Sequence, residues 1–191
     1  MTNRFEICGS IASGKTTLTK VFTNINSNVI FEDFSKISML DDFYTNPSAF
    51  SFETEISFTL QHYYQIKNAL EIKEKSVCDF SSVDDYAFAL VTLNDEEMNI
   101  YDQIFSYILK RIGKPKKLIK LSASTDELLH RIYRRGRKNE SGIDGDYLIE
   151  FENSLEKAIN QFYSDVPLIT INTEDISFLD YDNDFLERLL T

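Results

Sequence analysis

The sequence predicts an α/β fold with three layers, in which a five-stranded parallel sheet carries helices on both faces. Short apolar runs of strand length alternate with longer segments whose apolar residues recur at helical spacing. Such alternation requires right-handed crossovers, and these build a parallel sheet. The chain has 191 residues, 42% of them hydrophobic, and neither a linker nor a repeat interrupts it. We therefore expect one domain over residues 1–191.

The first strand, Phe5–Cys8, leads directly into Gly9–Thr16, which matches the P-loop pattern G-x-x-x-x-G-K-[ST] at every fixed position. Apolar residues at helical spacing follow, so the motif lies between a strand and a helix. In this setting glycines bring backbone N–H groups close to phosphates, Lys15 reaches the β- and γ-phosphates, and the Thr16 hydroxyl can hold Mg²⁺. The predicted triphosphate site consists of Gly9, Ser10, Ile11, Ala12, Ser13, Gly14, Lys15, Thr16 and Thr17.

The next two strands each deliver a carboxylate to their carboxyl end. The second, Asn28–Phe31, ends at Glu32, and the third, Val77–Asp79, ends in an aspartate. Ligands of parallel sheets gather at this edge, so the P-loop, Glu32 and Asp79 should share one site. An irregular polar stretch is expected up to Asp42. The remaining expected elements are strands at Leu118–Ser122 and Leu168–Ile171, helices at Phe50–Ile72, Ser82–Leu93, Asp95–Ile112, Thr125–Arg135, Asp146–Tyr163 and about Asp182–Leu190, and a charged loop at Gly136–Gly145.

Composition and charge narrow the classes of function. A formal net charge of −11 argues against a general nucleic-acid binder, because phosphate backbones are held mainly by Lys and Arg. Eleven of the 20 Lys and Arg residues nevertheless lie between Lys110 and Lys138, so phosphate should be met there. The N-terminus leads straight into the first strand and no apolar run is long enough for a membrane, so we expect a cytoplasmic protein. Cys8 and Cys78 suit buried thiols in a reducing compartment.

Several segments, in the same order, resemble the deoxynucleoside kinase family over most of the chain. The resemblance implies that Glu32 is the general base on the nucleoside 5′-hydroxyl. Asp79–Ser81 resembles the acidic-Arg-Ser motif of the family, with Phe80 in place of Arg. Phe43–Pro47 and Phe50–Glu53 resemble the substrate-binding start of the long second helix. Substrate contacts are accordingly expected from Glu32, Tyr44, Phe52, Glu53, Phe80, Asp85 and Glu140.

The segment Leu129–Glu140 resembles the arginine-rich lid of the family, which would cover about residues 131–145. Arg131, Arg134 and Arg135 share one helical face, and a glycine-flanked loop able to close follows them. Guanidinium groups above the γ-phosphate would stabilise the charge that develops during phosphoryl transfer. Taken alone, the stretch is as typical of a solvated basic face at a helix end as it is of a lid. The presence of the P-loop favours the lid.

Three positions depart from the family pattern, all on the acceptor side. Phe80 cannot supply the expected positive charge, so either another cation, such as Arg134, replaces it or the acceptor is oriented differently. Glu53 falls where the family usually has a base-contacting Gln; an ionised Glu only accepts hydrogen bonds and would suit the adjacent N1–H and N2–H₂ donors of guanine. The family's base-contacting Arg aligns with Leu60 or its neighbours, of which His62 is either a hydrogen-bonding substitute or a structural residue.

With the resemblance, these features predict a kinase that transfers the γ-phosphate of ATP to the 5′-hydroxyl of a deoxynucleoside, with deoxyguanosine as the leading substrate hypothesis. Thr16 and Asp79 would hold Mg²⁺. The resemblance also implies a homodimer packed through the long helices. A nucleoside monophosphate kinase and a non-catalytic nucleotide sensor are the alternatives. The expected catalytic groups are Glu32, Lys15, Arg131, Arg135 and Arg137.

Overall fold

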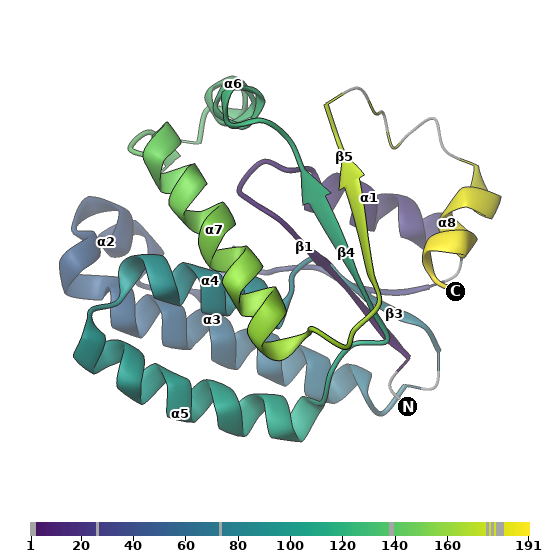
Figure 1. Cartoon of the computed structure of the whole chain (residues 1–191), viewed down its shortest axis with the longest axis horizontal. Coiled ribbons are helices and arrows are strands. Elements are labelled where there is room, and N and C mark those ends of the chain that lie inside the picture. The colour runs from purple at the N-terminus through teal and green to yellow at the C-terminus, as the bar shows by residue number, and fades with distance from the viewer. Residues whose placement is uncertain are drawn as a thin grey trace.

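The computed structural model describes residues 3–25, 27–72, 74–137, 140–174, 176, 178 and 182–191. Its sheet is built from β1 (Arg4–Cys8), β2 (Asn28–Ile30), β3 (Ser76–Cys78), β4 (Lys117–Ser122) and β5 (Leu168–Asn172). These strands run parallel in the order β2-β3-β1-β4-β5, with β1 in the centre (Figure 1). The predicted five-stranded parallel sheet is confirmed.

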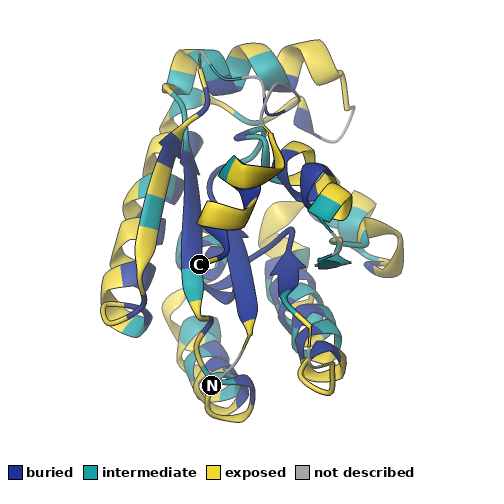
Figure 2. Ribbon diagram, turned by 90° about the vertical axis from the view of Figure 1, so that its right-hand side faces the viewer, coloured by how far each residue is buried: buried dark blue, intermediate teal, exposed yellow. Residues whose placement is uncertain are grey.

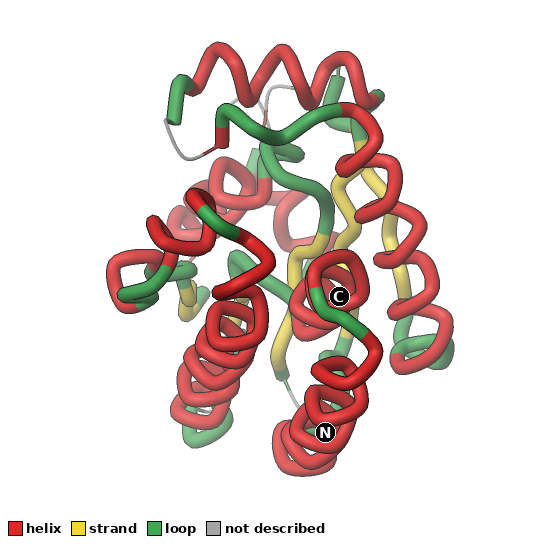
Figure 3. Tube along the Cα trace, turned by 90° about the vertical axis from the view of Figure 1, so that its left-hand side faces the viewer, coloured by secondary structure: helices red, strands yellow, loops and turns green. Residues whose placement is uncertain are grey.

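Helices cover both faces of the sheet (Figures 2 and 3), and strand side chains divide between the faces with a period of two. Phe5 and Ile7 of β1 pack with α1 and α8 on one face, whereas Cys8 and, from β4, Leu118 pack with α4, α5 and α7 on the other. The predicted three-layer arrangement therefore holds. The helices are α1 (Lys15–Val21), α2 (Leu40–Thr45), α3 (Pro47–Ala69), α4 (Ser82–Thr92), α5 (Asp95–Ile112), α6 (Thr125–Arg135), α7 (Gly145–Phe162) and α8 (Asn183–Leu189).

Capping residues fix where the long helices begin and end. The Ser81 hydroxyl caps α4, and Asn94 begins α5 with a capping box. Helix α6 stops at Gly136, whose φ of 66° is left-handed. Helix α3 begins at Pro47, ahead of the predicted start at Phe50, because proline suits the first helical position, where its missing N–H would be unpaired anyway.

The segment between β2 and α3 differs from the prediction. Phe34–Lys36 forms a 3₁₀ turn and α2 occupies Leu40–Thr45, where an irregular stretch up to Asp42 was expected. No residue of either element, both described in full, is buried. Neither therefore carries the apolar periodicity by which a helix is recognised in sequence. Residues 138 and 139 of the predicted charged loop lie outside the described residues.

The two cysteines are free and buried, as predicted. Burial raises the pKa of the Cys8 thiol and the pKa of the Cys78 thiol, which keeps both protonated and unreactive at neutral pH. Within the described part of the chain, no helix is both long enough and apolar enough to span a membrane.

Candidate active site

A large cavity opens at the edge of the sheet toward which β4 and β5 point in Figure 1. Its volume is about 1550 Å³. A pocket for one small ligand typically measures about 300–1,000 Å³, so this cavity has room for a nucleotide and a second substrate. The cavity wall is formed by the P-loop, Glu32 shortly after β2, the first turn of α4 and the arginines of α6.

The P-loop backbone depends on glycine at two points. Gly9 has a φ of 142°, and a Cβ there would lie 2.4 Å from the carbonyl oxygen of Leu121. Gly14, with a φ of 104°, immediately precedes α1. Both values belong to the left-handed region that side chains disfavour. The predicted motif thus adopts a close-packed loop at the cavity floor.

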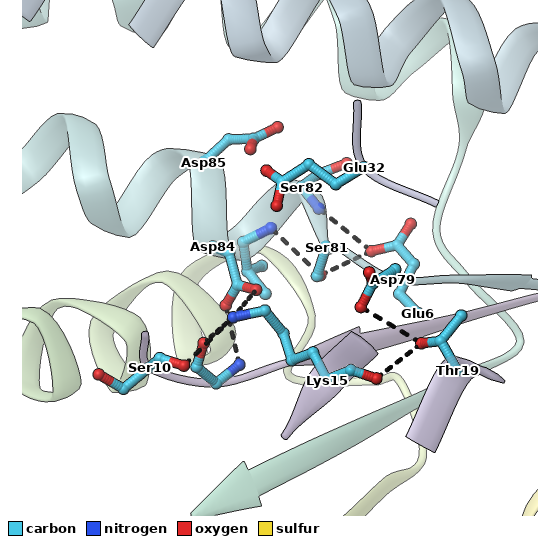
Figure 4. A network of polar contacts seen from close by, with 12 residues as sticks. Glu6, Ser10, Lys15, Thr19, Glu32, Asp79, Ser81, Ser82, Asp84 and Asp85 are labelled. Atoms are coloured by element: carbon cyan, nitrogen blue, oxygen red, sulfur yellow. Dashed lines mark hydrogen bonds and ion pairs between the residues drawn. The ribbon is translucent and has the colours of Figure 1, made fainter. Parts of the chain in front are cut away.

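Lys15 and Asp84 form the centre of this floor (Figure 4). The Lys15 ammonium donates to the Gly9 carbonyl oxygen at 2.5 Å and lies 3.9 Å from Asp84 Oδ2. Asp84 Oδ1 accepts the Gly9 N–H at 3.1 Å. Burial raises the pKa of Asp84 to about 7, although Lys15 and the Gly9 N–H oppose that shift. Sequence reasoning did not include Asp84 among the site residues; its position in the capped first turn of α4 was the available signal.

Asp79 and Thr16 meet beside the loop. The Asp79 carboxylate accepts hydrogen bonds from the Thr16 hydroxyl and, at 3.3 Å, from the Thr19 hydroxyl. Burial raises the pKa of Asp79 to about 6, against the effects of the Thr16 hydrogen bond and the Lys15 charge. A carboxylate and a hydroxyl are the oxygen ligands that Mg²⁺ accepts, so this pair fits the predicted metal role. The described residues contain no group of three or more His, Cys, Asp or Glu side chains that could bind a metal unaided.

Glu32 lies across the floor from Lys15, beside His62 and Asp85. His62 Nδ1 is 2.8 Å from Asp85 Oδ1, and His62 Nε2 is 3.5 Å from Glu32 Oε1. The imidazole stacks on the Phe80 ring with centroids 3.8 Å apart and an interplanar angle of 8°. Burial alone would lower the pKa of His62, but the two carboxylates raise it to about 10. His62 is thus a basic side chain within 3.5 Å of Glu32, and the replacement of the family arginine by a cation such as Arg134 stays a prediction.

The arginines of α6 and the following turn border the opposite wall. Arg131 donates to the Thr173 carbonyl oxygen at 2.7 Å and to the Ala12 carbonyl oxygen at 3.4 Å, which joins α6 to the P-loop. Arg135 and Arg137 both donate to the Glu140 carboxylate, at 2.5 Å and 3.1 Å. Glu140 is buried between them, and its contact with the substrate stays a prediction. That this segment closes as a lid stays a prediction.

Most of the predicted site residues share the cavity, and a few do not. Gly9 and Asp79 lie behind its wall, and Phe52 and Glu53 lie outside it. The predicted residues that line it are Ser10, Ile11, Ala12, Ser13, Gly14, Lys15, Thr16, Thr17, Glu32, Tyr44, Phe80, Asp85, Arg131, Arg135, Arg137 and Glu140.

Comparison with known families decides what this constellation belongs to. The family model described as deoxynucleoside kinase matches residues 5–190. The chain belongs to the deoxynucleoside kinase family. It is thus an ATP-dependent phosphotransferase. It is 31% identical to deoxyguanosine kinase of Bacillus subtilis over 87% of this chain and 83% of that protein. It is 27% identical to deoxyadenosine kinase of Dictyostelium discoideum, over 87% of this chain and 70% of that protein.

Solved structures agree on the fold of this kinase. Deoxyadenosine kinase of M. mycoides with bound dCTP matches with a TM-score of 0.79 and 20% identity, over 98% of this chain and 96% of that chain. The same enzyme with dCMP and dCDP matches with a TM-score of 0.84 and 19% identity, over 97% of this chain and 98% of that chain. At these identities the likeness concerns the architecture, and it agrees with the three layers described above.

The cavity wall formed by α3 contains Glu55 and not Glu53, the residue predicted from the sequence. Glu53 is exposed, whereas Glu55 is buried and lines the cavity. Successive residues of a helix turn by about 100°, so a shift of two positions moves a side chain to nearly the opposite face. Glu55 accepts a hydrogen bond from the Thr92 hydroxyl at 3.1 Å. Burial, with a contribution from Asp85, raises the pKa of Glu55 to about 8 against the Thr92 hydrogen bond.

The buried face of α3 around Glu55 is largely polar. Helix α3 buries a stripe of polar residues, and the same helix leaves Leu60 48% exposed. Buried polar side chains on a helix are more informative than exposed apolar ones, because each needs a partner or a ligand. The stripe consists of Ser51, Thr54, Glu55, Thr59 and His62.

Proposed function

We propose that this kinase transfers the γ-phosphate of ATP to the 5′-hydroxyl of a purine deoxynucleoside, with deoxyguanosine as the first substrate to test. The observation that supports it best is the continuity of one cavity from the P-loop past Glu32 to the buried carboxyl of Glu55. A donor phosphate at Lys15 and an acceptor base at Glu55 would bring the acceptor hydroxyl between them, beside Glu32. The proposed phosphate donor and the proposed acceptor are both inferred from this geometry and from the kinase relatives.

Glu32 is the proposed general base. Its side chain is 19% exposed, toward the cavity, so a bound hydroxyl can reach it. The carboxylate would take the proton of the 5′-hydroxyl while that oxygen bonds to the γ-phosphorus, and the bond from phosphorus to the ADP oxygen would break. Positioning of this kind and charge stabilisation supply most of the catalysis in phosphoryl transfer.

Cations from two sides would stabilise the transferring group. Lys15 would exchange its contact with the Gly9 carbonyl oxygen for the phosphates, and Arg131 already lies against the P-loop. Arg135 and Arg137 would leave Glu140 for the phosphate if the predicted lid closes. Guanidinium groups in such a position neutralise the charge on the equatorial oxygens.

Thr16 and Asp79 are the proposed holders of Mg²⁺. Both present oxygen atoms beside the loop, and Mg²⁺ usually takes one or two protein ligands together with substrate phosphates. When bound, the ion would neutralise charge across the β- and γ-phosphates. The two hydroxyls of Thr16 and Thr19 orient the Asp79 carboxylate toward this role.

Glu55 is the proposed contact to the base, in place of Glu53. An ionised Glu55 accepts two hydrogen bonds and matches the adjacent N1–H and N2–H₂ donors of guanine. A protonated Glu55 donates one and accepts one, which matches N6–H₂ and N1 of adenine. Either state pairs with a purine edge, in line with the deoxyguanosine and deoxyadenosine kinases among the relatives.

The direct test is phosphate transfer from ATP to a panel of deoxynucleosides, their ribose forms and their monophosphates. The proposal predicts a higher kcat/KM with deoxyguanosine and deoxyadenosine than with the pyrimidine deoxynucleosides. E55Q should change the ratio of kcat/KM for guanine and adenine by about tenfold or more, because one lost hydrogen bond to a base changes discrimination by that order. E53Q, at an exposed position on the same helix, serves as the control. Activity confined to monophosphates would overturn the acceptor.

A homodimer and a cytoplasmic location complete the proposal. Apolar side chains of α3 and α5 are exposed: Tyr64 is 64% exposed and Tyr107 58%. Large exposed aromatics on two long helices support a subunit interface there. Light scattering after gel filtration would measure the mass, and a monomer at micromolar concentration would contradict the interface. Two free, buried thiols suit a reducing compartment.

A further inference from the structure

Three carboxylates crowd the floor of the cavity next to the acceptor. Asp84 and Asp85 are buried, and each feels the charge of Glu32. Among these three carboxylates, Asp84 is the one that pairs with Lys15, at 3.9 Å. Two like charges in a poorly solvated site cannot both stay ionised without a cation between them. Glu32 and Asp85 therefore need a cation of their own if Glu32 is to accept a proton.

His62 lies between these two carboxylates. Both Asp85 oxygens are within 3.0 Å of Nδ1, and Nε2 points to Glu32 Oε1 at 3.5 Å. The Phe80 ring, stacked at 3.8 Å, fixes the plane of the imidazole. Within the described part of the chain, Nε2 is buried and makes no hydrogen bond. A small movement of either side chain would bring Nε2 and the Glu32 carboxylate into a hydrogen bond.

We propose that His62 is a positioning residue of the phosphoryl transfer: held by Asp85 and Phe80, its ring orients the Glu32 carboxylate beside the acceptor hydroxyl. The inference rests on the proposed role of Glu32. It adds an Asp85–His62–Glu32 chain in which the buried aspartate holds the ring, the ring holds the base, and the base meets the substrate. The stacked phenyl ring accepts a flat cation on its face.

The charged groups around His62 are consistent with a positively charged ring that positions Glu32. Burial of His62 opposes its charge, yet Asp85 and Glu32 raise the pKa of His62 to about 10, so the imidazolium persists at neutral pH and is lost only as the pH rises toward that value. The titratable groups that face Glu32 and His62 are Asp85 and Asp84 on α4, Asp79 after β3, and Tyr44 on α2.

Nuclear magnetic resonance of ¹⁵N-histidine protein tests the arrangement without catalysis. The chain has two histidines, and exposed His130 provides an internal reference. His62 should keep both ring protons from about pH 6 to about pH 8. In D85N, and to a smaller extent in E32Q, His62 should begin to lose a proton there. A neutral His62 ring in the wild-type enzyme at pH 7 would overturn the inference, whatever the enzyme's substrate proves to be.

Kinetics test the positioning role. H62Q should lower kcat about tenfold to a hundredfold and leave KM for ATP unchanged, because the Glu32 carboxylate is then no longer held beside the acceptor hydroxyl. H62R, which keeps a flat cation on Phe80, should recover part of the lost turnover. H130Q is the matched control. Wild-type turnover in H62Q would contradict the inference while leaving the proposed function intact; failure of wild-type enzyme on every deoxynucleoside would contradict the function instead.

Discussion

The Ser81 hydroxyl donates a hydrogen bond to the Glu6 carboxylate at 2.7 Å, and this contact fastens the first turn of α4 to the central strand beneath the active site. Glu6 is fully buried and also pairs with Arg4 at 2.8 Å. The same Ser81 oxygen caps α4 by accepting the Val83 N–H. Because Asp84 and Asp85 lie in that first turn, the cap sets where both carboxylates meet the cavity.

S81A should lower the free energy of unfolding by about 2–4 kcal/mol, since it removes a helix cap and leaves a buried carboxylate short of a donor. Urea denaturation monitored by circular dichroism measures the change. S124A removes a cap at the more exposed start of α6 and should cost only about 1 kcal/mol. Equal losses in the two variants would contradict the role assigned to the Glu6 contact.

G9A should abolish ATP binding at ordinary concentrations, because its Cβ would collide with the Leu121 carbonyl oxygen at 2.4 Å and displace the P-loop. G113A is the matched control: Gly113 also has a positive φ, of 65°, but a Cβ there meets nothing within 4 Å. In G113A the free energy of unfolding should fall by about 1–2 kcal/mol, because alanine disfavours a positive φ, and the affinity for ATP should not change. Calorimetric titration with ATP separates the two, and ATP binding by G9A at wild-type affinity would refute the close-packed loop.

The stability of the unliganded protein should fall as the pH rises from about 4.5 to about 8, in part because of Glu55. Its pKa in the folded protein is raised to about 8, so the folded state holds a proton that the unfolded chain has already released. E55Q removes this contribution: it should match the wild type in Tm near pH 5 and exceed it near pH 8.5. Differential scanning calorimetry at both pH values provides the measurement. A wild-type Tm that rises over this range relative to E55Q would show that Glu55 is ionised when buried. E53Q should follow the wild type throughout.

The sequence was sufficient to predict features that residues close together in the chain form by themselves. The P-loop is contiguous, and α5 carries both its apolar stripe and the capping signal at Asn94, so each was predictable from neighbouring residues. Glu32 followed from its place after a strand. Helix α2, with no buried face, offered no such signal.

The acceptor side was harder because it depends on rotation about α3. The packing of α3 against its neighbours determines which glutamate faces the cavity, and it places Glu55 there and leaves Glu53 outside. His62 gains its partners from α4 and from the segment after β2, which are distant in sequence. No local pattern distinguishes such a residue from a structural histidine.

Turnover by E32Q tests the central claim most directly. With deoxyguanosine and ATP, E32Q should lose about 10²- to 10⁴-fold in kcat, because the 5′-hydroxyl then has no base, while its Kd for ATP stays at the wild-type value. D33N, which changes the adjacent carboxylate outside the cavity, should retain wild-type kcat. A wild-type rate in E32Q would contradict the account, since the proton of the acceptor hydroxyl would then leave without Glu32.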